Sequence, residues 1–216
     1  FTTFPPSVPV LTTHEVSGIT STTAVSGGNI TSDGGSPVTA RGVCWATTEN
    51  PTISNSKTTN GSGTGDFASD LTGLQPGTIY YVRAYATNSI GTAYGNDVQF
   101  TALAVPPSVT TSAVSSITLT TAVSGGNVTN SGGAPVTARG VCWSTTSGPV
   151  ATGFHTTDGS GTGSFISNIS GLSPNTTYYL RAYATNNAGT SYGTELSFNT
   201  SPVTAPSVTT GTVSNV

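Results

Sequence analysis

Residues 74–88 read Leu-Gln-Pro-Gly-Thr-Ile-Tyr-Tyr-Val-Arg-Ala-Tyr-Ala-Thr-Asn, which is typical of a long β-strand that follows a tight turn. Successive side chains of a strand point to opposite faces of its sheet. The buried face should therefore carry Tyr80, Val82, Ala84 and Ala86. The outward face should carry Tyr81, Arg83 and Tyr85. Tyr80 closely follows the turn at Pro76, where a tyrosine corner would bury the ring and bond its hydroxyl to backbone a few residues upstream.

The same stretch occurs a second time, because nearly the whole chain is a duplication. Residues 10–101 align with residues 108–199 without insertion or deletion, so that Cys44 matches Cys142 at a constant offset of 98 positions. Self-similarity at a fixed period marks an array of structural units, whose function usually comes from the length and surface of the array. A single catalytic pocket is therefore not expected.

Each repeat is predicted to be all-β. No stretch shows the 3.6-residue apolar period of a helix, and Gly, Pro, Asn or Asp interrupts the sequence at the short intervals of a β-sandwich. In the first repeat the expected strands are residues 8–14, 20–30, 37–47, 56–60, 66–72, 78–88 and 93–101. Thr and Val dominate these segments, as β-propensity favours. The predicted fold class is two tandem seven-stranded antiparallel sandwiches of the immunoglobulin-like kind.

Three motifs resemble fibronectin type III domains. They are the Leu-x-Pro-x-Thr-x-Tyr run at 74–80, Arg-Gly-Val-Cys-Trp-Ala-Thr-Thr at 41–48 and Gly-Thr-x-Tyr-Gly at 91–95. Together they are similar to the tandem fibronectin-III-like repeats of large surface and secreted proteins of Bacteroidota-type bacteria. The second strand lacks the large aromatic residue usual in that family, and Trp45 on the third strand is expected to fill its volume. The resemblance covers both repeats and implies a fold more than a function.

Composition excludes several partners. Charged residues make up 6% of the chain, with five Lys and Arg in total and a formal charge of −3. So few cations do not neutralise a nucleic-acid backbone or an anionic membrane surface. The apolar runs are also far shorter than the roughly 20 residues that span a bilayer. Because Ser and Thr supply about a third of the residues, the uncharged surface suits a stalk or fibre, and an extracellular or cell-surface location is predicted.

The two cysteines are predicted to be buried free thiols. Each repeat holds one cysteine, at equivalent positions, so no disulfide closes inside a unit. In units stacked end to end, the two would lie beyond the roughly 7 Å that a bridge spans between Cα atoms. A free cysteine of this kind behaves as a small apolar side chain.

No catalytic residue, metal ligand or cofactor site is predicted. His14 and His155 have no counterparts, because Ser112 and Lys57 stand at the matching positions. The carboxylates form no pair of constant spacing. The Gly-rich segment 60–66 resembles a calcium loop. It offers at most two side-chain carboxyl or amide oxygens, whereas calcium takes six to eight ligands. A turn is the favoured interpretation.

The outward face of the sixth strand is the candidate contact face. The third strand is its expected neighbour and can be turned in two ways. In one orientation this face lies beside Arg41, Val43 and Trp45, and in the other it lies beside Cys44. The arginines either stack between rings of their own module or contact a neighbouring chain or a glycan. The candidate residues are Arg41, Tyr81, Arg83, Tyr85, Arg139, Tyr179, Arg181 and Tyr183.

Partial repeats at both ends predict an array that continues beyond this chain. The expected divisions are the end of a preceding repeat with its linker (1–6), repeat one (7–101), a Pro-containing linker (102–107), repeat two (108–200) and a linker with the first strand of a following repeat (201–216). Short Pro-bearing linkers favour stiff connections. We expect residues 207–213 to be extended, and either paired or at a truncated, disordered end.

The sequence favours a non-enzymatic structural or adhesive role. The chain would be a segment of an extracellular repeat protein, acting as a stalk, adhesin or filament subunit in which many weak identical surfaces add up. Its partners would be neighbouring repeats, further copies in a filament, or a surface glycan or protein. The alternative is that the repeats are spacers or carbohydrate-binding accessory modules of a secreted multidomain enzyme.

Overall fold

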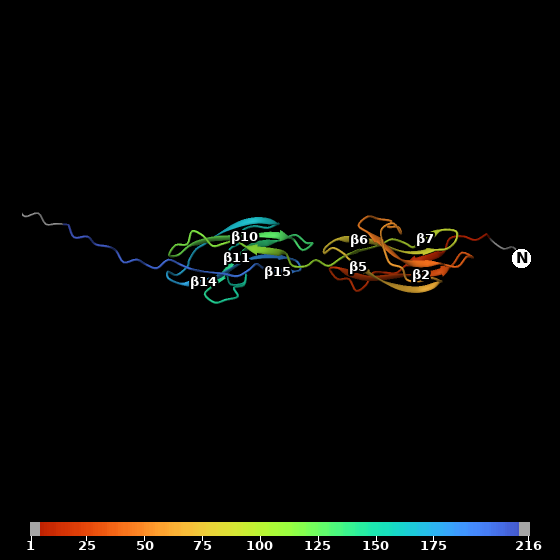
Figure 1. The fold of residues 1–216 in the computed structure, drawn as a ribbon, viewed down its shortest axis with the longest axis horizontal. Coiled ribbons are helices and arrows are strands. Elements are labelled where there is room, and N and C mark those ends of the chain that lie inside the picture. The colour runs from red at the N-terminus through yellow and green to blue at the C-terminus, as the bar shows by residue number, and fades with distance from the viewer. Residues whose placement is uncertain (1–4, 212–216) are drawn as a thin grey trace, which may run out of the picture. The chain divides into compact units, whose positions relative to one another are not determined.

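The computed structural model describes residues 5–211, and every regular element in that range is a β-strand. The strands gather in two compact units (Figure 1). The predicted all-β class is therefore confirmed. Phe1 to Thr3, which the sequence assigns to the close of a preceding repeat, lie outside the described residues.

The first unit is a sandwich of two antiparallel sheets. Its strands are β1 (Val10–Thr13), β2 (Thr23–Ser32), β3 (Ala40–Ala46), β4 (Ser56–Lys57), β5 (Gly65–Thr72), β6 (Ile79–Thr87), β7 (Thr92–Tyr94) and β8 (Val98–Thr101). One sheet has the order β1-β2-β5, and the other has the order β4-β3-β6-β7 with β8 also pairing β6.

β7 and β8 are two parts of the predicted seventh strand. The break falls at Asn96, whose side-chain oxygen accepts the Thr13 N–H at 3.0 Å and whose carbonyl accepts the Thr13 hydroxyl at 2.6 Å. Asn96 therefore bonds across to β1 in the facing sheet, and the ladder with β6 resumes only at β8. The seven-stranded sandwich holds, and its last strand is interrupted near Asn96 while both of its parts pair with β6.

The second unit repeats this topology. Its strands are β9 (Ser108–Thr111), β10 (Ala122–Asn130), β11 (Ala138–Ser144), β12 (Phe154–His155), β13 (Gly163–Ile169), β14 (Thr177–Asn186), β15 (Gly189–Tyr192) and β16 (Leu196–Asn199). The sheet orders are β13-β10-β9 and β12-β11-β14-β15, with β16 also pairing β14.

The predicted faces of the sixth strand are confirmed at the core. The buried residues of β6 include Tyr80, Val82, Ala84 and Ala86. The Gln75 N–H donates to the Tyr80 hydroxyl at 3.0 Å, and the Ser173 N–H donates to the Tyr178 hydroxyl at the same distance. Both tyrosine corners therefore bury an aromatic ring while its polar end stays bonded.

Trp45 is buried in the core of the first repeat, as predicted. The space against β2, however, is taken mainly by other atoms. A Cβ added to Gly28 would lie 2.5 Å from Ala84 Cβ, 2.6 Å from the Thr12 carbonyl oxygen and 3.3 Å from the Phe67 ring. A side chain larger than that of glycine has no room at this position of β2.

The segment after the second repeat forms no strand within its described part. Residues 202–211 are exposed, and Val208 retains 87% of its accessible surface. Residues 212 and 213, the end of the predicted first strand of a following repeat, lie outside the described range. Pairing of this segment in a longer array stays a prediction.

Candidate functional site

The register of β3 and β6 decides which residues share the predicted contact face. Cys44 lies opposite Arg83, and Gly42 lies opposite Tyr85. The alternative that places Cys44 on this face is therefore the one that the structure adopts. Arg41 belongs to the other face of β3, so Arg41 and its counterpart Arg139 are not part of the predicted surface.

Tyr85 and Tyr183 lie on the predicted outer face of the sheet, but they are buried there and do not form an exposed contact surface. Their exposed fractions are 4% and 3%. The Tyr85 hydroxyl donates to the Thr58 carbonyl at 2.7 Å, because the chain after β4 folds back over this face. Gly42 makes the room, since a Cβ at that position would lie 2.9 Å from the Tyr85 ring.

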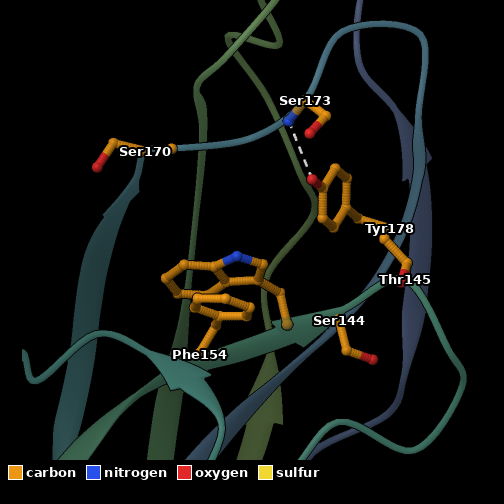
Figure 2. Close-up of a pocket in the computed structure, with 8 residues that line it drawn as sticks. Ser144, Thr145, Phe154, Ser170, Ser173 and Tyr178 are labelled. Atoms are coloured by element: carbon orange, nitrogen blue, oxygen red, sulfur yellow. Dashed lines mark hydrogen bonds between the residues drawn. The ribbon is translucent and has the colours of Figure 1, made fainter.

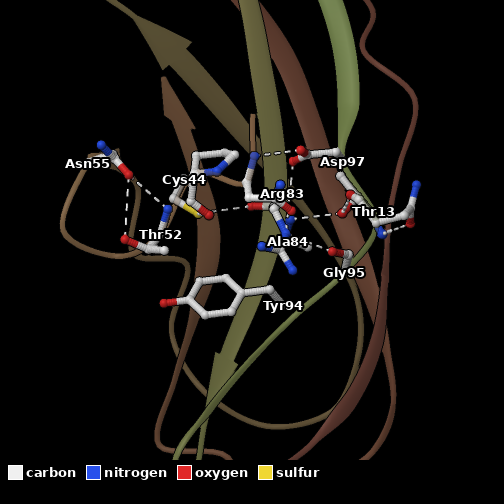
Figure 3. A network of polar contacts seen from close by, with 12 residues as sticks. Thr13, Cys44, Thr52, Asn55, Arg83, Ala84, Tyr94, Gly95 and Asp97 are labelled. Carbon is white, nitrogen blue, oxygen red and sulfur yellow. Dashed lines mark hydrogen bonds and ion pairs between the residues drawn. The ribbon is translucent and has the colours of Figure 1, made fainter. Parts of the chain in front are cut away.

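Arg83 is held inside its own module (Figure 3). Its guanidinium carbon lies 4.8 Å from the centre of the Tyr94 ring, and its Nε donates to the Gly95 carbonyl at 2.9 Å. Asp97 lies 3.9 Å from the same Nε. Arg181 stacks on the equivalent tyrosine at 4.0 Å. These contacts are the intramolecular stacking that the sequence left open as one of two interpretations.

Arg41 and Arg139 clamp the glycine-rich loops. Arg41 lies over the Phe67 ring at 5.3 Å, and its guanidinium donates to the carbonyls of Asn60, Gly63 and Thr64. Arg139 stands over the corresponding ring at 5.4 Å. The remaining candidates, Tyr81 and Tyr179, are half-buried. The eight candidate residues therefore do not form one continuous contact face.

The thiols are free and fully buried, as predicted. The Cys44 thiol donates to the Pro51 carbonyl at 3.3 Å. Burial raises the pKa of Cys44 to about 11, and the same cause raises the pKa of Cys142. A thiol rather than a thiolate is present at neutral pH, so neither cysteine is a ready nucleophile.

Possible metal ligands are dispersed. Among residues 5–211, no three side chains of the types His, Cys, Asp and Glu come together as a metal site. His14 lies 3.2 Å from Asp66, and exposed His155 packs edge-on against Tyr183. In the glycine-rich loops, Asn60 donates to the Ala68 carbonyl and Asp158 accepts the Ser167 hydroxyl. These loops are turns whose side chains bond within the module.

A pocket in the second repeat was not predicted (Figure 2). Its volume is about 360 Å³, and its lining includes Trp143, Phe154, Tyr178, Ser144, Ser170 and Ser173. Trp143 and Phe154 stack with ring centres 6.2 Å apart and an interplanar angle of 18°. Phe154 is 73% exposed, so one aromatic surface stays open to solvent. Hydroxyls and aromatic rings, without a charged group, make up this lining.

The pocket depends on positions where the repeats differ. Ser56 in the first repeat matches Phe154, and Gln75 matches Ser173. The exposed ring is therefore special to the second repeat. Sequence reasoning missed the pocket because it weighed what the repeats share. The signal in the sequence was a difference between the repeats: the second has the apolar residue Phe154 where the first has the small polar residue Ser56.

Comparison with known proteins adds little beyond the fold. No family model matches the chain, and no curated protein matches it. Among solved structures, the chain is similar to the chicken CNTN1 FN1-FN3 domains, at 15% identity and a TM-score of 0.48. The match covers 91% of this chain and 67% of that one. The assignment of two fibronectin-III-like sandwiches rests on the strands and sheet orders described above. The described part of the chain holds no helix that could cross a membrane.

Proposed function

We propose that the chain is a non-enzymatic structural or adhesive segment of an extracellular repeat protein. Residues 7–101 and 108–200 are its repeated modules, and residues 102–107 are the linker. Such modules serve as a stalk, an adhesin or a filament subunit, in which the number of units sets reach and total attachment.

The observation that carries this proposal is that the arginines, the buried tyrosines and the thiols bond within their own modules. Arg83 stacks on Tyr94, the Tyr85 hydroxyl bonds Thr58, and the Cys44 thiol is buried with a raised pKa. A catalytic centre needs at least one such group facing a substrate. Charged residues are only 6% of the sequence, which suits contacts that are individually weak.

Antibodies against residues 7–200 would test the extracellular part of the proposal. They should label intact source cells or extracellular material as strongly as permeabilised cells. A cytoplasmic protein, labelled in parallel, should be detected only after permeabilisation. Labelling of this chain only after permeabilisation would contradict the proposal.

The pocket favours a second candidate function, a carbohydrate-binding accessory module. Phe154 presents an open ring beside Ser144, Ser170 and Ser173. An aromatic face packs against the C–H face of a sugar ring, while hydroxyl groups bond its polar edges. Because no charged side chain is in the lining, a neutral sugar fits better than an acidic one.

A fluorescence titration with neutral oligosaccharides would test this candidate. In a Trp45→Phe background only Trp143 reports, and its emission should change saturably as a sugar binds beside it. Phe154→Ser, which installs the first repeat's residue, should abolish the change. An unchanged titration in Phe154→Ser, or no response to any neutral sugar, would reject the carbohydrate site while leaving the structural role intact.

A further inference from the structure

We propose that β13 is a self-complementary edge strand, through which the second repeats of two chains pair antiparallel about a two-fold axis at Ile166. The partner is a second copy of this chain. This inference goes beyond the proposed function and does not depend on it. It rests on the edge position of β13, on its backbone, and on residues that differ from those of β5.

The backbone of Ile166 faces away from its own sheet. β13 is an outer strand of the order β13-β10-β9, and Ile166 lies opposite Gly125 of β10. The Gly125 carbonyl accepts the Ser112 N–H at 3.0 Å, so Gly125 bonds toward the β9 side. In an antiparallel ladder this makes Gly125 and Ile166 a non-hydrogen-bonded pair. The N–H and C=O of Ile166 therefore point outward, where an added strand would bond.

The first repeat caps this outward carbonyl and the second repeat does not. In β5 the equivalent carbonyl, that of Ala68, accepts the Asn60 side-chain N–H at 2.7 Å. Asp158 replaces Asn60, and its side chain has no N–H to donate. Its carboxylate accepts hydroxyls from Thr156 and Ser167 instead. The change from amide to carboxylate thus removes the cap from the edge of β13.

Charge also distinguishes the two edges. The outward side chains of β5 include Asp66 and Asp70 on either side of Ala68, and both are exposed. A two-fold axis at Ala68 would set Asp66 opposite Asp70 of a second copy, twice over. Like charges directly opposite each other destabilise a strand pair, and charged edges are a common protection against unwanted pairing.

β13 lacks this protection and fits itself. Its outward side chains include Ser164, Ile166 and Asn168, all exposed. A two-fold axis at Ile166 sets Ser164 opposite Asn168 of the second copy, where the two can hydrogen-bond. Ile166, which is 72% exposed, meets its own counterpart and is buried. The two three-stranded sheets would join into one continuous sheet.

Disulfide trapping tests the pairing, since so short a contact is expected to be weak. Hydrogen-bonded partners in an antiparallel pair lie about 5.5 Å apart at Cα, within disulfide range. Ile166→Cys should therefore form a dimer in a glutathione redox buffer, seen on a non-reducing gel. Ala68→Cys is the matched control and should form about tenfold less, because the charges and the Asn60 cap oppose pairing. The buried native thiols contribute little.

A second pair of variants tests the register. Chains carrying Ser164→Cys should cross-link to chains carrying Asn168→Cys, and each variant alone should cross-link much less. Adding Ser164→Asp and Asn168→Asp to Ile166→Cys recreates the charges of β5 and should reduce its dimer to the Ala68→Cys level.

Three results would overturn the proposal. One is equal cross-linking by Ile166→Cys and Ala68→Cys, which indicates random collision. Another is an Ile166→Cys dimer that the added aspartates do not reduce. The third is preferential cross-linking of Ile166→Cys chains to Ala68→Cys chains, which would mean that β13 pairs with β5 in a head-to-tail chain instead.

Discussion

At the scale of single residues, two buried tyrosines of the first repeat keep their hydroxyl groups hydrogen-bonded to the backbone. The Tyr80 hydroxyl accepts the Gln75 N–H, and the Tyr85 hydroxyl donates to the Thr58 carbonyl. A buried polar group without a partner costs more than the net gain from making its bond. These tyrosines therefore fix the path of two loops, as well as filling the core.

Replacing the corner tyrosine tests this directly. Tyr80→Phe keeps the ring but removes the acceptor of the part-buried hydrogen bond from the Gln75 N–H, so the first repeat should lose about 1 kcal/mol of unfolding free energy. Denaturant unfolding followed by Trp45 fluorescence, in a Trp143→Phe background, measures the change. Tyr81→Phe, at a half-buried position, is the control and should change little. Equal losses in the two variants would contradict the role of the corner.

The thiols provide a second residue-scale prediction. Because burial raises the pKa of Cys44 to about 11, the protonated form should persist in the folded protein well above neutral pH. A thiol-reactive disulfide reagent should leave both cysteines unmodified in the native chain at pH 8 and modify both in denaturant. Rapid modification of the native chain would show that the thiols are accessible.

At the scale of elements, the alternation of residues along β6 predicted which side chains lie on each face of the sheet. It placed Tyr80 and Val82 in the core correctly, because a strand with one buried face has little freedom of register. It also placed Tyr85 on the correct face of the sheet, but it did not predict the burial of Tyr85, which depends on Gly42 in another strand and on the chain after β4 folding over both. Coverage by a distant segment is a tertiary effect, and the residue pattern of β6 alone does not contain it.

The loop before β12 supplies an element-scale prediction on pH. Hydrogen bonds from the Gly148 N–H, at 2.6 Å, and from the Ser147 hydroxyl, at 2.7 Å, lower the pKa of Glu195. Because the pKa of Glu195 is lower in the folded chain, these hydrogen bonds stabilise the fold at pH values above the pKa of Glu in the unfolded chain, about 4.3. Their contribution is lost as the pH falls through the pKa of Glu195 in the folded chain. The amide proton of Gly148 should therefore shift with a midpoint below 4.3 in an NMR titration.

Glu195→Gln provides the control for this titration. The variant keeps an oxygen that can accept a hydrogen bond but does not ionise, so the shift of the Gly148 amide proton with pH should disappear. A midpoint at or above the ordinary Glu value, or an unchanged titration in Glu195→Gln, would show that this carboxylate does not hold the loop.

At the scale of the whole chain, shared residues specify the fold and differing residues mark the candidate contacts. The tyrosine corners, stacked arginines and buried thiols occur in both repeats and act within each module. Phe154 and Ile166 are exposed apolar side chains where the first repeat has Ser56 and Ala68. Duplication supplied two copies of one stable framework, and divergence at its surface made the second copy distinct.

Stretching single molecules tests the central claim most directly, because a structural or adhesive segment has to carry force while its modules stay folded. Pulled from its two ends, the chain should show two separate unfolding events, each releasing about 30 nm of chain as one repeat of some 90 residues extends. Both events should return after relaxation. A smooth extension without events, or one event that releases both repeats together, would contradict the account of two independent load-carrying modules.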